Sequence, residues 1–308
     1  MNHTSNTAFP GDNYTADVRG RGMPHGYRQM FLGEDGAPAH PCYDPQKDLV
    51  LPSFKAPPHY KISPLAGKTP LVRDVLFFFK GDVGKGFRAP NYSNGVRQRL
   101  YKLWLDNDWK TKHNVWIGDR HDVPGEYSDM LARSKFCLVA PGDGWSGRVE
   151  DSILHGCVPV VIMDGAHVVF ETILDWPQFS IKIPEADINR TIEILLDVKP
   201  RRLRSMQAHL ARVWNRFRWV GGPALQAAAG RQLRENLAEH DKLREERVRQ
   251  EAEQKKADAA AATGAGDDTH DTHGGVQLPR PFRGDPSTDD AFGTLMQWLH
   301  SRIPMTRE

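Results

Sequence analysis

Residues Ser134–Met163 read SKFCLVAPGDGWSGRVEDSILHGCVPVVIM and decide the fold class. They contain two short apolar runs, Phe136–Ala140 and Val158–Met163, and each has the length and composition of a strand buried on both faces. A glycine-rich turn, Pro141–Arg148, separates the runs and leads into a helix expected over Gly147–His155. Strand, turn, helix and strand at this spacing predict a βαβ unit with parallel strands and a right-handed crossover.

The same alternation of apolar runs and amphipathic segments continues on both sides of this unit. It predicts an α/β fold with a Rossmann-like parallel sheet. We expect further strands at Val75–Phe79, Asn114–Ile117 and Ser180–Ile183, and further helices at Asn94–Leu105, Tyr127–Arg133, Ile188–Val198 and Leu203–Phe217.

Changes in composition divide the chain into three parts. Residues 1–46 are rich in Gly, Pro, Asn and His and predict an irregular leader or a remnant of another domain. Residues 47–222 carry the strand and helix pattern, and residues 223–308 predict a charged helix, a flexible linker and a short C-terminal helix.

Two helices are expected in the third part. Arg231–Lys256 mixes basic and acidic residues with i, i+4 pairs, which predicts a lone exposed helix. Ser287–Asp290 resembles a helix cap and precedes apolar residues at helical spacing, namely Phe292, Leu295, Met296, Leu299 and Ile303.

Composition excludes several classes of protein. The 308 residues carry 41 basic and 39 acidic side chains, so a net charge of +2 gives no global attraction to nucleic acid. No apolar run approaches the ~18 residues of a membrane helix, and the start, MNHTSNTAFPGDNY, does not resemble a signal peptide. Three cysteines are too few for a disulfide framework or a four-thiolate zinc site. We therefore expect neither a nucleic-acid partner nor a membrane span in this chain.

Two loops at carboxyl ends of the expected strands are candidates for ligand binding. Lys80–Arg88 reads KGDVGKGFR and follows the first strand, and PGDGWSGR precedes the helix at Gly147. Glycines let the backbone approach a ligand, and a helix N-terminus favours an anion. Ser146 is placed to cap that helix and to donate to a phosphate, and Arg148 suits a diphosphate. Asp151, one turn later on the same face, suits ribose hydroxyls.

Weaker features each keep a plain structural alternative. The glycine-rich turn matches neither GxGxxG nor a P-loop, so an ordinary βα turn stays open beside an anion site. Asp106–Asp108 has an Asp-x-Asp form, although an exposed helix stop is favoured, and Asp268–His273 is a loose candidate for metal binding. Cys137 and Cys157 lie on adjacent expected strands and can pair, but buried free thiols are the commoner state.

A stretch without acidic residues runs from Val198 to Arg234 and contains nine basic ones. A solvated helix face is the favoured explanation, and a surface for an acidic glycan or lipid is the alternative.

The central region resembles the exostosin family of glycosyltransferases (family 47). The resemblance rests on YSDMLARSKFCLVAPGDGWSGRVEDSILHGCVPVVIMDG, Tyr127–Gly165, in which SKFCL and GCVPVV are specific together. Segments such as KDLVLPSF, VLFFFKG, NYSNGVRQRL and VWNRFRW extend it over about Lys47–Trp219, and the wording around GDGWSGR is similar to green-algal or plant members.

This resemblance implies one half of a GT-B enzyme, the half that holds the nucleotide sugar. Such enzymes transfer a sugar with inversion from a UDP-sugar to a glycan, generally in the Golgi and without an essential metal or other cofactor. A hetero-oligomer with another glycosyltransferase is a further implied arrangement. The implied nucleotide-sugar-binding positions are Gly142, Asp143, Gly144, Ser146, Arg148, Asp151, Lys80, Gly81 and Glu171.

The sequence also departs from the family pattern. Asp151 stands where members usually have Glu, and Val169-Phe170 stands where they have Pro-Phe. The family's acceptor half would precede Lys47, where 46 residues stand, so no catalytic base is assigned. Two hypotheses follow: a sugar-transferring enzyme, or a truncated or degenerate module that binds a nucleotide sugar without turnover. A flavodoxin-like or dehydrogenase-type Rossmann protein is a third, and the missing GxGxxG loop argues against the dehydrogenase form.

Overall fold

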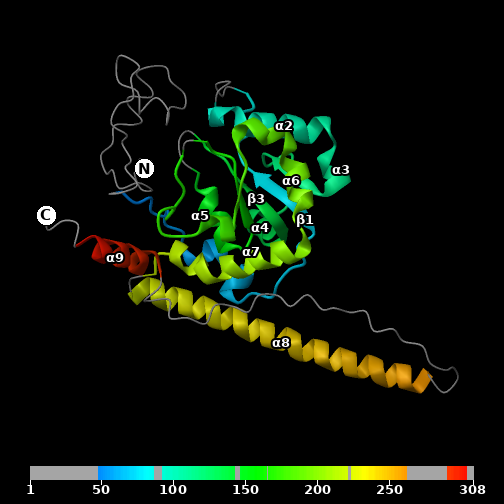
Figure 1. The fold of residues 1–308 in the computed structure, drawn as a ribbon. Helices are drawn as coiled ribbons and strands as arrows, with labels where there is room; N and C mark the ends of the chain where they lie inside the picture. The colour runs from blue at the N-terminus through cyan, green and yellow to red at the C-terminus, as the bar shows by residue number, and fades with distance from the viewer. Residues whose placement is uncertain are drawn as a thin grey trace, which may run out of the picture.

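A parallel sheet of five strands forms the centre of the described chain (Figure 1). The structure is a computed structural model that describes residues 48–86, 92–142, 146–164, 166–220, 223–261 and 290–303, with side chains in the helix 223–261 as far as residue 253. The strands are β1 (Val75–Lys80), β2 (Val115–Gly118), β3 (Ser134–Val139), β4 (Val158–Val161) and β5 (Ile181–Lys182), in the order β2-β1-β3-β4-β5. Each lies where the sequence predicted a strand, which confirms the α/β class.

Helices connect the strands and cover the sheet. The α-helices are α2 (Val96–Asp106), α3 (Trp109–His113), α4 (Tyr127–Arg133), α5 (Arg148–Leu154), α6 (Thr191–Asp197), α7 (Pro200–Val213), α8 (Pro223–Ala261) and α9 (Ala291–Arg302). Short 3-10 helices are η3 (Pro57–Tyr60), η4 (Pro64–Ala66), η5 (Tyr92–Gly95), η6 (Trp176–Gln178), η7 (Glu185–Arg190) and η8 (Trp214–Phe217).

The sheet is buried on both faces because its strands are largely apolar. On β1, Phe77 and Phe79 pack with residues of α2 and α6, whereas Phe78 packs with Met130 and Leu131 of α4. A third cluster surrounds α5 and joins it to α7 and η8. The continuous apolar runs of the sequence therefore predicted two-sided burial correctly.

The long helix α8 departs from the expectation of a lone exposed helix. Its first half lies against η3 and η4, and the Asn236 side chain is buried there. That amide donates to the carbonyls of Lys61 and Ala66, both at 2.9 Å. The second half is exposed, as predicted, with Leu243 and Val248 in contact with solvent. Lys68 also donates to Glu239 of this helix, so polar side chains, which an apolar periodicity does not report, help to hold the docked half.

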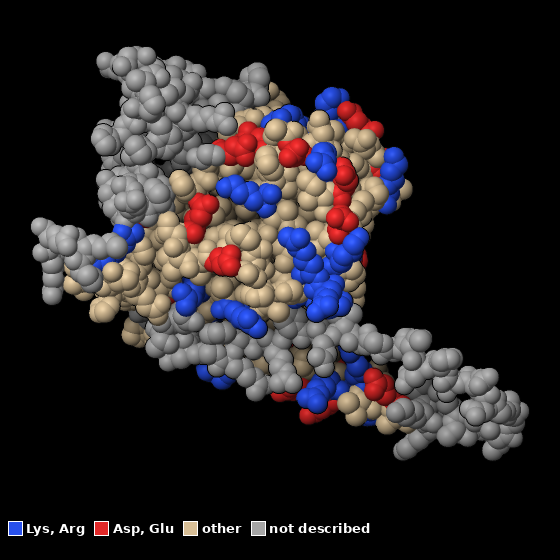
Figure 2. Space-filling model, in the orientation of Figure 1, with Lys and Arg blue, Asp and Glu red and all other residues tan. Residues whose placement is uncertain are grey.

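The basic residues of the stretch without acidic residues, Val198–Arg234, differ in how far they are buried. Arg201, Arg202 and Arg204 are exposed on α7, in line with a solvated face. Arg218 is buried, with its guanidinium 4.1 Å from the ring centroid of Trp214. Figure 2 shows Lys and Arg interspersed with Asp and Glu on the face it draws, as a net charge of +2 suggests.

The C-terminal helix α9 forms where the apolar spacing placed it. Asp290 caps it, because its Oδ1 accepts the Gly293 N–H at 2.8 Å and its Oδ2 accepts the Val220 N–H at 3.0 Å. Leu295 packs against the core around α5, whereas Phe292 is exposed. Of the helices that the structure describes, none combines the length and the apolar character needed to cross a membrane.

Candidate nucleotide-sugar site

The candidate site lies where the strand order reverses. The chain runs from β1 outward to β2 and then returns to β3 on the other side of β1, so the loops after β1 and β3 diverge from neighbouring carboxyl ends. Ligands of open parallel sheets bind at such a switch point. Five predicted site residues belong to these two loops and the helix start that follows them, namely Lys80, Gly81, Gly142, Ser146 and Arg148. Two more, Asp143 and Gly144, lie outside the described residues.

Arg148 ties the two loops together. Its Nη2 donates to the Lys80 carbonyl at 3.2 Å, and its Nη1 lies 3.5 Å from Asp151 Oδ2. The guanidinium also lies over the rings of Phe79 and Tyr127, 5.8 and 5.3 Å from their centroids. The side chain is 32% exposed, so a planar permanent cation is held in place and still reaches solvent.

Gly81 is required for the close approach of Arg148. A Cβ built at this position would lie 2.8 Å from Arg148 Nη2 and 3.1 Å from Phe79 Cζ. The glycine that sequence reasoning assigned to ligand approach therefore makes room for the arginine side chain.

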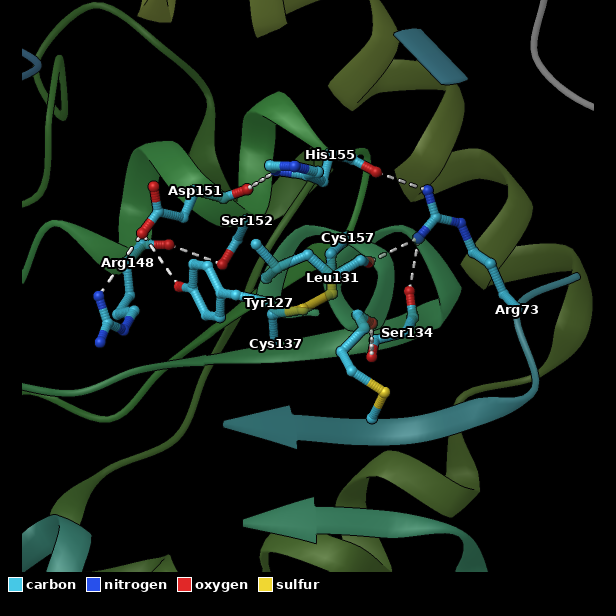
Figure 3. Close-up of a disulfide and its surroundings, with 11 residues drawn as sticks. Arg73, Tyr127, Leu131, Ser134, Cys137, Arg148, Asp151, Ser152, His155 and Cys157 are labelled. Carbon is cyan, nitrogen blue, oxygen red and sulfur yellow. Dashed lines mark hydrogen bonds and ion pairs between the residues drawn. A yellow bond between two sulfur atoms is a disulfide. The ribbon is translucent and has the colours of Figure 1, made fainter. Parts of the chain in front are cut away.

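Asp151 faces Arg148 across one turn of α5, as the sequence predicted. Its Oδ2 accepts the Tyr127 hydroxyl at 3.0 Å, and its Oδ1 lies 2.7 Å from Lys55 Nζ (Figure 3 shows the Tyr127 and Arg148 contacts). Burial, followed by the charge of Asp151, raises the pKa of Tyr127 well above its ordinary value, so the phenol stays a proton donor. A carboxylate has about four acceptor positions, and these three contacts leave one for a further donor.

The expected capping role of Ser146 is wrong. Gly147 is the N-cap of α5, and no side chain caps it. Ser146 is 6% exposed, and its Oγ has no hydrogen-bond partner among the residues that the structure describes. The hydroxyl is therefore buried without a partner among the described residues. Because α5 spans only seven residues, the charge at this site comes from side chains more than from the helix dipole.

Lys80 and Glu171 differ in their relation to this network. Lys80 is the last residue of β1, but its Nζ donates to the Gly125 carbonyl at 2.7 Å. Glu171 follows β4 and pairs with His167 at 2.9 Å and with Lys182 at 4.0 Å. Within the described residues it makes no contact with Arg148. Burial raises the pKa of Glu171. The hydrogen bond and charge of His167, the Val168 N–H and the charge of Lys182 together outweigh burial and leave this pKa below its ordinary value.

Sequence reasoning missed three residues of the network. Tyr127 and Lys55 come from separate segments, and nothing in the sequence marks them as neighbours of Asp151. Glu150 is 0% exposed, accepts the Ser53 N–H at 2.7 Å, and burial raises its pKa to about 7. The available signal for Glu150 was its position directly after Val149, in a turn of a buried helix.

A disulfide joins Cys137 of β3 to Cys157, just before β4 (Figure 3). The expectation that free thiols are the commoner state is therefore wrong here. The pairing follows from the parallel register, which sets Phe136 opposite Val158 and brings the two cysteines to a Cα–Cα separation of 5.9 Å.

Arg73 joins the C-terminal ends of α4 and α5 by hydrogen bonds. Its guanidinium donates to the carbonyls of Ser134 at 2.6 Å, His155 at 2.8 Å and Leu131 at 3.3 Å (Figure 3). It thereby satisfies carbonyls at the ends of α4 and α5, where a cation is favoured.

A family model described as the Exostosin GT47 domain matches residues 3–198, which is more than half of the chain. The chain belongs to the exostosin GT47 family. The match begins well upstream of Lys47, where we expected the resemblance to begin.

Several curated relatives of this GT47 chain come from plants. A probable glucuronoxylan glucuronosyltransferase of Arabidopsis thaliana is 30% identical over 179 residues, 56% of this chain and 36% of that protein. A probable glucuronosyltransferase of Oryza sativa subsp. japonica is 27% identical over 178 residues, 56% of this chain and 39% of that protein. A probable beta-1,4-xylosyltransferase of Arabidopsis thaliana is 26% identical over 200 residues, 62% of this chain and 45% of that protein. The aligned part thus spans between a third and a half of these relatives.

Proposed function

We propose that this chain holds the UDP-sugar donor of an inverting glycosyltransferase that acts on a polysaccharide or a glycoprotein glycan. Family membership supports the reaction class, and the relatives named for glucuronosyl and xylosyl transfer support a sugar donor. The observation that carries the proposal is the position of Arg148, fixed between the Lys80 carbonyl and Asp151 at the switch point and open to solvent.

Each residue of the network is assigned to a different part of the nucleotide sugar. Arg148 faces the diphosphate, and its fork of N–H donors suits two phosphate oxygens. Ser146, whose buried hydroxyl has no partner among the described residues, donates to the same group. Asp151 accepts a ribose hydroxyl with its remaining lone pair. Gly142 of the loop, together with Asp143 and Gly144, stays assigned to close approach of the backbone, and Glu171 to the sugar.

The chemistry is a direct displacement that needs no metal or other cofactor. An acceptor hydroxyl attacks the anomeric carbon from the face opposite the diphosphate and loses its proton to a base that we do not assign. A new carbon–oxygen bond forms as the bond to the diphosphate breaks, and UDP leaves with the electron pair. Arg148 stabilises the charge that develops on the leaving group.

The disulfide supports a location in the secretory pathway. Disulfides persist in oxidising compartments, and Cys137 pairs with Cys157 in the sheet core. We propose that the protein is located in the Golgi. Its expected substrates there are a nucleotide sugar and a glycan acceptor, and its expected partner in a hetero-oligomer is another glycosyltransferase. Glycosidase treatment and fractionation of the expressed protein test this location.

Calorimetry with UDP tests donor binding. We expect Arg148→Ala to weaken UDP binding about tenfold to a hundredfold, since a hydrogen bond to a charged group contributes about 1.5–3 kcal/mol. The control is Arg190→Ala, which removes an exposed arginine paired with Glu193. Absence of UDP binding by the unchanged protein would refute the proposal.

A transfer assay then separates the two hypotheses for this chain. Radiolabelled UDP-glucuronate and UDP-xylose are incubated with glycan acceptors, with and without EDTA. Transfer with an inverted anomeric centre, insensitive to EDTA, supports the enzyme. UDP binding without transfer or donor hydrolysis supports the alternative, a module that binds a nucleotide sugar without turnover.

A further inference from the structure

Lys55 occupies an unusual place for a lysine. Its Nζ lies 2.7 Å from Asp151 Oδ1, and its side chain is only 19% exposed. Lysine is among the residue types most often exposed, so a largely covered one needs a reason. It belongs to the segment that precedes the sheet, far in sequence from both loops of the candidate site.

The segment around Lys55 is held at two points. The Ser53 N–H donates to Glu150 Oε1 at 2.7 Å, and the Trp219 Nε1–H donates to the Pro52 carbonyl at 2.8 Å. Both anchors lie within three residues of Lys55, and each joins the segment to a partly buried hydrogen bond with a distant part of the chain. The ammonium group is therefore set in position before any ligand arrives, which lowers the entropic cost of using it.

Two cations share one carboxylate at this point. Lys55 contacts Oδ1 of Asp151, and Arg148 lies 3.5 Å from Oδ2 of the same side chain. Together the three groups carry a net charge of +1. Lys55 thus adds to the positive charge around Asp151, and this one carboxylate fixes the spacing of the two cations.

We propose that Lys55 is a second phosphate-binding cation of the donor site, paired with Arg148 and positioned by Asp151. This inference rests on the proposed function and deepens it. A diphosphate distributes its charge over two phosphate groups. Two cations held apart therefore fit a diphosphate better than they fit a monophosphate. Lys55 therefore selects nucleoside diphosphates over nucleoside monophosphates and nucleosides.

Calorimetry of the full chain with uridine, UMP and UDP tests this assignment. Lys55→Met should weaken UDP binding about tenfold, weaken UMP binding less and leave uridine binding unchanged. Lys55→Gln keeps a donor towards Asp151 without the charge, so it should show the same order of losses with less effect on folding. Lys61→Met, which removes an exposed lysine six residues away, should leave all three affinities unchanged.

The outcomes distinguish this inference from the proposed function. Unchanged protein that binds UDP, with Lys55 variants that bind UDP equally well, overturns the assignment of Lys55 alone. Equal losses for uridine and UDP also overturn it, because they indicate a general disturbance of the site. Unchanged protein that binds no UDP overturns the proposed function and this inference with it. The inference is supported if the Lys55 variants lose more affinity for UDP than for uridine, and if this difference becomes smaller at high salt.

Discussion

Replacing Glu150 by glutamine should stabilise the protein at alkaline pH and change its stability little at pH 5. The carboxyl is 0% exposed, and burial raises its pKa from the ordinary 4.5 to about 7, against the smaller opposing effect of Lys55. The folded state therefore holds a proton that the unfolded state releases between these two values. Stability contributed by the protonated carboxyl is lost as the pH rises from about 4.5 to about 7, and above that the loss is complete.

The size of this effect follows from the pKa difference. Each pKa unit is worth about 1.4 kcal/mol, so the ionised side chain costs the folded state about 3 kcal/mol at pH 8. Glutamine has the same shape and keeps an oxygen for the Ser53 N–H, but it cannot ionise. For a domain of this size the variant should melt roughly 10 °C above the unchanged protein at pH 8.

The assay is thermal or urea unfolding of both proteins between pH 5 and pH 8.5. The difference between the two curves isolates Glu150, because every other titrating group is common to both. Glu251→Gln, an exposed glutamate of α8, serves as the control and should track the unchanged protein at every pH. Curves for Glu150→Gln that run parallel to the unchanged protein across this range would refute the reasoning.

Three further changes test the surroundings of the site. Arg73→Met removes donors from three carbonyls and should lower the free energy of unfolding by about 3 kcal/mol in urea titrations; a loss under 1 kcal/mol would contradict its role as a clamp. Cys137→Ala combined with Cys157→Ala should cost about 3 kcal/mol and abolish any effect of reductant on melting, whereas the unchanged protein should melt earlier in reductant. Gly81→Ala should displace Arg148 and weaken UDP binding with little change in melting, and unaltered binding would show that the arginine adapts.

The neighbours of Asp151 show how a site depends on distant segments. The residue before it in sequence, Glu150, is held by the segment near Ser53, and Asp151 itself is held by Lys55 and Tyr127. Asp151 is therefore held by side chains from segments that lie far from it in the sequence. Asp151 thus positions the cations of Lys55 and Arg148, and it is also the residue proposed to bind the ribose.

Local sequence determined the strands and most of the helices, whereas the strand order and its switch point came from the structure. Apolar runs such as Val75–Phe79 form buried strands because each residue finds an apolar partner on one of two faces, whichever way it points. The same local logic placed Arg148 and Asp151 on one face of a helix, since residues three apart in a helix are neighbours.

Only the tertiary structure decided which distant groups complete the site. The covered position of Lys55, the burial of Glu150, the docking of α8 through Asn236 and the Cys137–Cys157 bond all depend on contacts between segments far apart in the chain. Periodicity reports which face of an element is apolar, but it carries no information on what packs against that face. Burial, and with it the charge of a carboxyl or the pairing of a thiol, is a property of the assembled neighbours.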